Sequence, residues 1–160
     1  MNSQQGDRMI LDILRRFGAT IGLEKEGCWI QPSVLHGIEI DGSNIPDLIP
    51  VLAVTAAAAC GKTRIYHAER LRLKESDRIE STCALINGLG GKAQPTEDGM
   101  IITGGGLRGG KVNSFNDHRI AMSAAVAAVA SGEPVTIENA SAADKSYPEF
   151  FSIFREHIFH

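Results

Sequence analysis

The chain has 160 residues, of which 43% are hydrophobic and 22% are charged, and its formal net charge is −3. This length and composition predict a soluble globular protein with one ordinary domain. The negative balance argues against a dedicated nucleic-acid binder or a binder of acidic membranes, because such proteins usually carry a basic surface. Any basic cluster in this chain is therefore expected to be local.

The three cysteines are Cys28, Cys60 and Cys83, an odd and widely spaced set that is typical of reduced thiols. No apolar stretch is long enough to cross a membrane, and the first eight residues lack the apolar core of a signal peptide. We therefore expect a cytoplasmic protein with no membrane contact. No spacing of the CxxC type is present, and His157 and His160 are better explained as a frayed end than as a metal pair, so no metal site is expected.

The first predicted element is a helix over residues 10–18, whose apolar residues follow the i, i+3, i+4, i+7 pattern and which ends at Gly18. A similar helix over residues 79–91 stops at Gly90. Since 90 minus 18 is 72, the two copies lie 72 residues apart. This self-similarity predicts a repeat architecture.

The elements after each helix also correspond. Predicted hairpins span residues 20–31 and 92–103, and the second contains the Asp98-Gly99 turn signal. Each hairpin leads to an alanine-rich helix, over residues 51–60 in the first copy and 121–130 in the second, and then to a strand. Because both helices are apolar nearly all round, we expect them to be buried at the centre of the domain.

Aspartates precede three of the predicted helices. Asp47 aligns with Asp117, and both stand where an N-cap is wanted. Asp77 with Glu80 matches the capping-box pattern D-x-x-E. Each of these aspartates therefore has a sufficient structural role as a helix cap.

A third copy begins near the end of the chain. The repeat units are approximately residues 8–68, residues 69–140 and a partial unit over residues 141–160. The fold class predicted from this pattern is α+β or α/β, built from pseudo-symmetric units of helix, strand pair, helix and strand.

Cationic side chains stand at the same turns of successive units. The cationic Lys74 and Arg78, with Glu75 between them, lie between a strand predicted at residues 71–73 and the second helix. Asn116–Arg119 (NDHR) opens another helix. A helix N-terminus already carries a positive dipole end, so basic residues there destabilise it unless an anion is present. Together with Lys145 in the third copy, these turns predict a shared anion site.

The glycine-rich segment 104–109, GGGLRG, fits the G-x-G-x-x-G pattern. No helix is expected to open on it, and no acidic residue follows at the spacing of a dinucleotide-binding site. We interpret it as a flexible loop.

The motifs LKESDR at residues 73–78 and NDHR at residues 116–119, with Pro-Asp before an alanine-rich helix and a late Lys-Ser-Tyr-Pro, resemble the C-terminal part of the 5-enolpyruvylshikimate-3-phosphate synthase family. The resemblance covers essentially the entire chain. It implies an enolpyruvyl transferase-like fold, an inside-out α/β barrel of βαβαββ-type units, here most of the C-terminal domain and incomplete on its N-terminal side. It also implies transfer of the enolpyruvyl group of phosphoenolpyruvate to the 5-hydroxyl of shikimate 3-phosphate, with release of phosphate, in aromatic amino acid biosynthesis. No cofactor is implied.

The resemblance assigns roles residue by residue. Asp47 matches the proton acceptor, which also contacts shikimate 3-phosphate, and Glu75 matches the proton donor. The remaining matches are Lys74 on shikimate 3-phosphate, Arg78, Arg119 and Lys145 on phosphoenolpyruvate, and His118 and Arg70 in possible supporting positions. Two carboxylates suit this addition, because one removes the hydroxyl proton and the other protonates the methylene carbon. Burial favours a protonated Glu75, whereas the neighbouring Lys74 and Arg78 favour the ionised form.

Family members are more than twice as long as this chain, so the resemblance implies a fragment whose partner is the N-terminal half of the same enzyme. We expect the fragment alone to be inactive and to expose a sheet edge or a core face. Three alternatives remain open: a non-catalytic module that binds one phosphorylated ligand, a relative of the transferase that acts on UDP-N-acetylglucosamine, and a purely structural repeat protein.

Overall fold

The computed structural model describes residues 9–25 and 27–158 and shows the expected mixed α/β fold. The helices are α1 (Met9–Arg16), α2 (Ile49–Ala58), α3 (Arg78–Gly88), α4 (His118–Ser131) and α5 (Phe150–Ile158), with short 3₁₀ helices η2 (Glu69–Leu73) and η3 (Ala140–Lys145). The strands are β1 (Thr20–Glu24), β2 (Gly27–Gln31), β3 (Glu39–Asp41), β4 (Lys62–Tyr66), β5 (Lys92–Pro95), β6 (Met100–Thr103), β7 (Gly110–Asn113) and β8 (Val135–Glu138). Predictions that concern residues 1–8, Glu26 or residues 159–160, including the dismissed pair with His160, fall outside the described residues.

The elements recur in the same order along the chain. A helix, a hairpin, a strand, an alanine-rich helix, a second strand and a 3₁₀ helix run from α1 to η2 and again from α3 to η3, after which α5 starts the series a third time. Both predicted hairpins are confirmed, since β1 pairs with β2 and β5 pairs with β6, each antiparallel. The boundaries of the repeat units stay a prediction.

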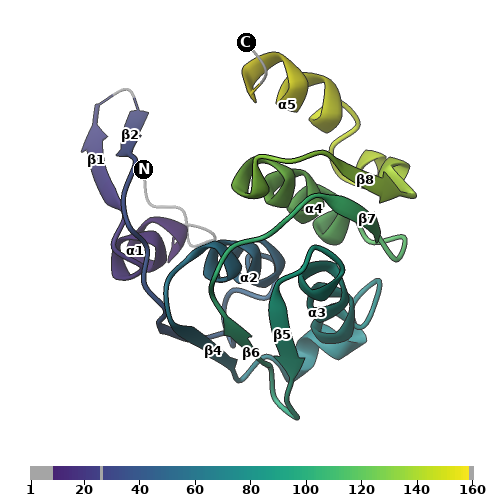
Figure 1. The fold of residues 1–160 in the computed structure, drawn as a ribbon, viewed down its shortest axis with the longest axis horizontal. Helices are drawn as coiled ribbons and strands as arrows, with labels where there is room; N and C mark the ends of the chain where they lie inside the picture. Colours follow the sequence, from purple (N-terminus) through teal and green to yellow (C-terminus); the bar gives the residue numbers. More distant parts are fainter. Residues whose placement is uncertain (1–8, 26, 159–160) are drawn as a thin grey trace.

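The strands form three sheets. The largest has the order β3-β4-β6-β5, in which β3 and β4 are parallel and the hairpin β5–β6 adds to β4 through an antiparallel pair. The other two sheets are the hairpin β1–β2 and the parallel pair β7–β8. Figure 1 shows the hairpin β1–β2 and the strand β8 on opposite flanks of the molecule, with the helices α2 and α4 between them.

The alanine-rich helices form the centre of the core, as predicted. Most residues of α2 are buried, and the buried residues of α4 include Ile120, Ala121 and Ala124. Their small side chains permit the close approach of the two helices, which pack against each other. Three polar turns, at the starts of α2, α3 and α4, form the candidate site.

The segment 104–109 is a loop with no helix opening on it, as predicted. A Cβ atom on Gly104 would lie 1.9 Å from the carbonyl oxygen of Ala59, so only glycine fits there. The backbone amides of Gly105 and Gly106 donate to the carbonyl of Ala57 at the end of α2. These amides therefore satisfy a helix terminus, which explains the glycines without a phosphate ligand.

Two local predictions were wrong. Residues 71–73 were predicted as a strand but belong to η2, where successive side chains point about 120° apart, so Leu71 is buried while Leu73 is exposed. Asp47 was predicted to cap α2, but the N-cap is Leu48 and has no side-chain cap bond. Asp47 instead turns its carboxylate toward three basic side chains, described next.

Candidate active site

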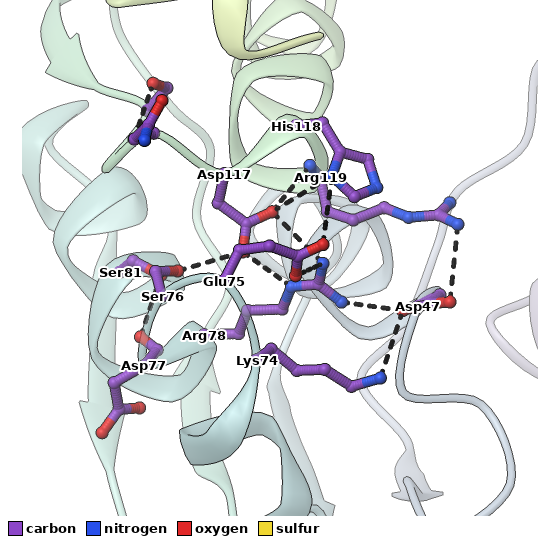
Figure 2. Close-up of polar contacts among 12 residues, drawn as sticks. Asp47, Lys74, Glu75, Ser76, Asp77, Arg78, Ser81, Asp117, His118 and Arg119 are labelled. Carbon is purple, nitrogen blue, oxygen red and sulfur yellow. Dashed lines mark hydrogen bonds and ion pairs between the residues drawn. The ribbon is translucent and has the colours of Figure 1, made fainter. Parts of the chain in front are cut away.

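The candidate site lies where three turns of the chain meet. Asp47 comes from the turn before α2, Lys74 and Glu75 follow η2, and Arg78 is the first residue of α3. The segment Asp117–Arg119 forms the start of α4. Figure 2 shows these side chains pointing toward one another from their separate elements.

Arg78 is the centre of this cluster and is almost fully buried, with 1% of its side chain exposed. Its Nη1 donates to Asp47 at 2.7 Å, its Nη2 donates to Glu75 at 2.6 Å, and its Nε donates to Asp117 at 2.8 Å. Burial opposes the charge, but these hydrogen bonds and the carboxylate charges together raise the pKa of Arg78 above its ordinary value. One guanidinium thus holds three carboxylates in place, as its planar fork allows.

Asp117 is the buried partner of Arg78 and was predicted only as a helix cap. The cap is confirmed, because its Oδ1 accepts from the Arg119 backbone N–H at 2.9 Å. Its side chain is 0% exposed, and Ser76 donates to its Oδ2 at 3.1 Å. Burial acts to raise the pKa of Asp117, but the hydrogen bond and charge of Arg78 outweigh it and lower the pKa.

The second N-cap prediction at this site is also confirmed. The Oδ1 of Asp77 accepts from the backbone N–H groups of Ile79 and Glu80. Its other carboxylate oxygen, Oδ2, accepts a hydrogen bond from Arg72 Nη1 at 2.9 Å. Asp77 therefore fixes the start of α3 and, with it, the position of Arg78.

Asp47 faces three cations. Besides Arg78, its carboxylate lies 3.9 Å from Lys74 Nζ and 3.5 Å from Arg119 Nη2. Partial burial acts to raise the pKa of Asp47, but the Arg78 hydrogen bond and the charges of Arg119 and Lys74 lower it below the ordinary value. Asp47 is therefore ionised near neutral pH, and its side chain remains 41% exposed.

Glu75 lies between Arg78 and His118. One of its carboxylate oxygens binds Arg78, and the other lies 3.5 Å from His118 Nδ1. The His118 side chain is mostly buried, whereas that of Glu75 is partly exposed. Imidazoles and carboxylates can both transfer protons, and here the two groups are neighbours at slightly more than hydrogen-bond distance.

Arg119 has a buried guanidinium nitrogen that the cluster leaves unpaired among the described residues. Its Nε is buried and lacks a hydrogen-bond partner among the described residues, and its nearest carboxylate is the one of Asp47 at 3.5 Å. A cavity of about 190 Å³ opens beside Asp47 and Arg119, with Met122 and Phe150 also in its wall. An orphaned guanidinium N–H beside an open cavity is a candidate donor for an anionic ligand.

Lys145 and Arg70 stand apart from the carboxylates. Lys145 donates to the backbone carbonyl of Asn116, 2.7 Å away, and so contacts the turn that precedes Asp117. The positive φ of Asn116, 58°, belongs to this turn. Arg70 is exposed, and within the described residues it joins none of the ion pairs of the cluster.

The atoms of Glu75, Asp117 and His118 approach within 4.8 Å of one another, a grouping that resembles a metal site. Here, however, Arg78 donates to both carboxylates. The guanidinium supplies the positive charge that a cation would bring. The carboxylate oxygens that could bind a metal ion are therefore already engaged by Arg78.

Sequence reasoning missed Ser76 and the second role of Asp117. The available signal was the alignment of Asp117 with Asp47, since two aspartates at equivalent turns of a repeat face the same centre. Burial of Asp117 with Arg78 depends on contacts between residues 39 positions apart, which the local sequence does not show.

Comparison with solved structures identifies the fold. The enolpyruvyl transferase NikO from Streptomyces tendae matches with a TM-score of 0.75 at 20% identity, over 91% of this chain and 34% of that one. The fold is therefore that of an enolpyruvyl transferase. An EPSP synthase structure from Acinetobacter baumannii matches with a TM-score of 0.83 at 30% identity, over 99% of this chain and 40% of that one.

The family follows from the sequence comparisons. The family model of EPSP synthase (3-phosphoshikimate 1-carboxyvinyltransferase) matches residues 1–154, so the chain belongs to the EPSP synthase family. A 3-phosphoshikimate 1-carboxyvinyltransferase from Clostridium novyi is 45% identical over 98% of this chain, and one from Archaeoglobus fulgidus is 46% identical over 94%. The chain spans 36% of the length of each of these relatives. Within the described residues, no helix has the length and apolar character needed to cross a membrane.

Proposed function

We propose that the chain is the C-terminal part of an enzyme that transfers the enolpyruvyl group of phosphoenolpyruvate to the 5-hydroxyl of shikimate 3-phosphate and releases phosphate. The observation that carries this proposal is the arrangement of Asp47 and Glu75 on one buried arginine, Arg78, beside the partly satisfied Arg119. Two positioned carboxylates and an available cation are what a proton-coupled addition between anionic substrates requires. Membership of the EPSP synthase family supports the same assignment.

The carboxylates divide the proton transfers in this proposal. Asp47, whose pKa is lowered, is ionised and accepts the proton of the shikimate hydroxyl. Glu75 donates a proton to the methylene carbon of phosphoenolpyruvate, with His118 at 3.5 Å to exchange protons with it. Lys74 contacts shikimate 3-phosphate, and Arg119 and Lys145 bind phosphoenolpyruvate. Arg78 has the same ligand by resemblance, and its contacts also make it the residue that positions both carboxylates.

The charges of the cluster support a partner for this chain. Lys74, Arg78, Arg119 and Lys145 supply four positive charges. The two carboxylates with lowered pKa values, Asp47 and Asp117, supply two negative ones, so the balance without the proton donor Glu75 is 4 − 2 = +2. The two substrates together carry about six negative charges. The remaining cations have to come from the rest of the enzyme, the N-terminal half, and no cofactor is needed. The three free cysteines support a cytoplasmic location for the enzyme.

Complementation tests the proposed function. The chain is combined with the part of the Clostridium novyi relative that lies outside the matched region, and phosphate release from the two substrates is measured. Glu75→Gln should lower kcat by ~10²–10⁴, because it removes the proton donor. Glu97→Gln, an exposed substitution in the turn of β5–β6, is the matched control and should leave kcat unchanged. A complemented enzyme that is equally active with Glu75→Gln would contradict the assignment.

The chain alone is expected to be inactive, since half of the electrostatic clamp is missing. Turnover by the purified chain that Glu75→Gln abolishes would refute this expectation. Separate titrations with phosphoenolpyruvate and shikimate 3-phosphate test the alternative of a binding module, which should hold one ligand with a Kd below ~1 mM. The names of the relatives favour the shikimate enzyme over a transferase acting on UDP-N-acetylglucosamine.

A further inference from the structure

The turn between β7 and α4 holds two residues in an unusual backbone conformation. The backbone N–H of Asp117 donates to the carbonyl of Ser114 at 3.0 Å, which closes a four-residue turn. Its central residues, Phe115 and Asn116, have φ values of 52° and 58°. Asparagine tolerates a positive φ, but a bulky phenylalanine rarely adopts one. The turn is therefore strained, and surrounding contacts have to hold it.

The flanking side chains supply these contacts. The Oδ1 of Asn113 accepts from the Phe115 backbone N–H at 2.6 Å, and the Oγ of Ser114 accepts from the Asn116 backbone N–H at 3.2 Å. The Ser114 hydroxyl also donates to the carbonyl of Asn139 at 2.9 Å. The side chain of Asn116 is exposed and forms no hydrogen bond with another described residue. Asn116 thus contributes to the turn through its backbone.

This turn has an equivalent 72 residues earlier in the chain. The backbone N–H of Ser114 donates to the carbonyl of Glu138 at 3.0 Å, and that of Gly42 donates to the carbonyl of Tyr66 at 2.8 Å. Donors and acceptors of the two bonds differ by the same number of residues, since 114 − 42 = 138 − 66 = 72. The turn that starts at Gly42 is therefore the equivalent of the turn that starts at Ser114.

The earlier turn closes without strain. The backbone N–H of Ile45 donates to the carbonyl of Gly42 at 3.3 Å. Neither of its central residues, Ser43 and Asn44, has a positive φ. No described residue donates a hydrogen bond to the carbonyl of Asn44. A positive φ is therefore not needed to close such a turn, and the strain of the later copy requires another explanation.

The strained turn differs from its equivalent in holding a cation. The carbonyl of Asn116, whose direction follows from the backbone dihedrals of this residue, accepts from Lys145 Nζ at 2.7 Å. Lys145 is the last residue of η3, and the bond from Ser114 to Asn139 lies directly before the first. The turn thus contacts both ends of η3 and fixes the lysine that ends it.

A carbonyl holds the lysine without neutralising it. An ammonium group has three N–H donors, so the bond to Asn116 leaves two of them for another acceptor. Among the described residues, the lysines that form ion pairs are Lys74 and Lys111. Lys145 is exposed and keeps its full charge. A carboxylate in place of the carbonyl would also orient Lys145, but it would cancel this charge.

We propose that Asn116 is a positioning residue for phosphoenolpyruvate, and that it acts through Lys145 by means of the carbonyl direction that its positive φ sets. This inference rests on the proposed function, in which Lys145 binds phosphoenolpyruvate. The same turn ends at Asp117, which caps α4 at the backbone N–H of Arg119. One strained turn therefore sets the positions of two phosphoenolpyruvate cations, Lys145 and Arg119, relative to each other.

Nuclear magnetic resonance of the lysine ammonium groups, at low temperature and mildly acidic pH, tests the contact in the chain itself. Lys145 should give a signal protected from exchange with water, which Lys145→Ala removes. Asn116→Gly should keep this signal, because glycine adopts a positive φ freely. Asn116→Val should lose it, because a β-branched residue disfavours a positive φ and lets the turn relax.

Asn116→Ala provides a milder variant, which should fold by circular dichroism and show intermediate protection. Protection that survives in Asn116→Val would overturn the inference. Loss of protection in Asn116→Gly would also overturn it, since the amide group rather than the backbone conformation would then be responsible.

Steady-state kinetics of the complemented enzyme test the consequence for the ligand. Asn116→Val should raise KM for phosphoenolpyruvate by about 3–10-fold, because a free lysine side chain has to be ordered when the ligand binds. KM for shikimate 3-phosphate should change much less, and Asn116→Gly should behave like the parent. Lys145→Ala should raise KM for phosphoenolpyruvate by at least ~10-fold. Adding Asn116→Val to Lys145→Ala should cause no further rise, because the two residues act as one unit.

These measurements separate failure of the inference from failure of the proposed function. If Lys145→Ala leaves KM for phosphoenolpyruvate unchanged, the assignment of Lys145 is wrong and the inference is overturned with it. If Lys145→Ala raises this KM but Asn116→Val does not, the proposed function stands and the inference alone is overturned. A further rise in the double variant has the same meaning, since a merely structural loss would add to the effect of Lys145→Ala.

Discussion

Arg78 and Arg119 stand in the first turns of two helices, each behind an aspartate N-cap, yet their surroundings differ. Arg78 is 1% exposed and all three of its guanidinium nitrogens bind carboxylates. Arg119 is 32% exposed, has one carboxylate at 3.5 Å, and retains a buried Nε that no described residue contacts by a hydrogen bond. The comparison teaches that similar local sequence can produce one arginine that holds the site together and another that remains available for an anion. Three substitutions test this division.

The largest effect is expected from Arg78→Ala. This change leaves Asp117 buried without its cation, so the free energy of unfolding should fall by ~3–5 kcal/mol. Urea denaturation followed by circular dichroism measures the loss. Arg78→Lys keeps the charge but not the fork that joins three carboxylates, so it should be intermediate. A loss below ~1 kcal/mol for Arg78→Ala would show that the cluster does not depend on this arginine.

The second largest effect is expected from acid, which should weaken the ion pairs of Arg78 with Asp47 and Asp117. Asp47 and Asp117 both have pKa values lowered in the folded state. Such groups stabilise the fold above their unfolded pKa, ~3.9, and this contribution is lost as the pH falls through the folded pKa. The free energy of unfolding should therefore decrease below about pH 4.

Asp117→Asn should flatten this acid dependence, because it removes the buried titrating group, and should also lower stability at neutral pH. Asp144→Asn, an exposed substitution in η3, should change neither property. Denaturation curves at a series of pH values supply the measurement. An unchanged acid slope in Asp117→Asn would be inconsistent with its ion pair to Arg78.

The smallest effect on stability is expected from Arg119→Ala. It should change the free energy of unfolding by no more than ~0.5 kcal/mol, as for other partly exposed side chains. In the complemented enzyme it should raise KM for phosphoenolpyruvate by at least ~10-fold, since a charge-assisted hydrogen bond contributes ~1.5–3 kcal/mol. Arg108→Ala, at an exposed arginine, should leave KM unchanged. A large loss of stability without an effect on KM would reverse the roles of the two arginines.

Much of the fold could be predicted because its signals are local. Apolar periodicity, the Asp98-Gly99 turn and the caps at Asp77 and Asp117 all operate within a few residues, and the structure confirms them. The prediction of a strand at residues 71–73 was wrong because alternating leucines also fit a 3₁₀ turn in which just one of them is buried. The pairing of β6 with β4 could not be predicted, because η2, α3 and β5 lie between these strands in the chain.

The site was partly predictable for a related reason. Residue type and position at helix starts selected Lys74, Glu75, Arg78 and Arg119, and the family resemblance added Asp47 and His118. The structure brings these six side chains together. Sequence did not reveal that Arg78 is buried while Arg119 is not, because burial depends on how the helices α3 and α4 pack. The cap role alone sufficed to explain Asp117, so its alignment with Asp47 was the one sequence signal of its second role as the buried partner of Arg78.

The buried thiol of Cys83 reports how often the helix that carries Arg78 opens. Cys83 lies in α3, is 3% exposed, and burial raises the pKa of its thiol to about 12. Alkylation therefore requires α3 to open, whereas Cys28 and Cys60 are exposed and can react without such opening. The rate of modification at Cys83 under native conditions consequently measures how often the helix that holds the candidate site comes apart.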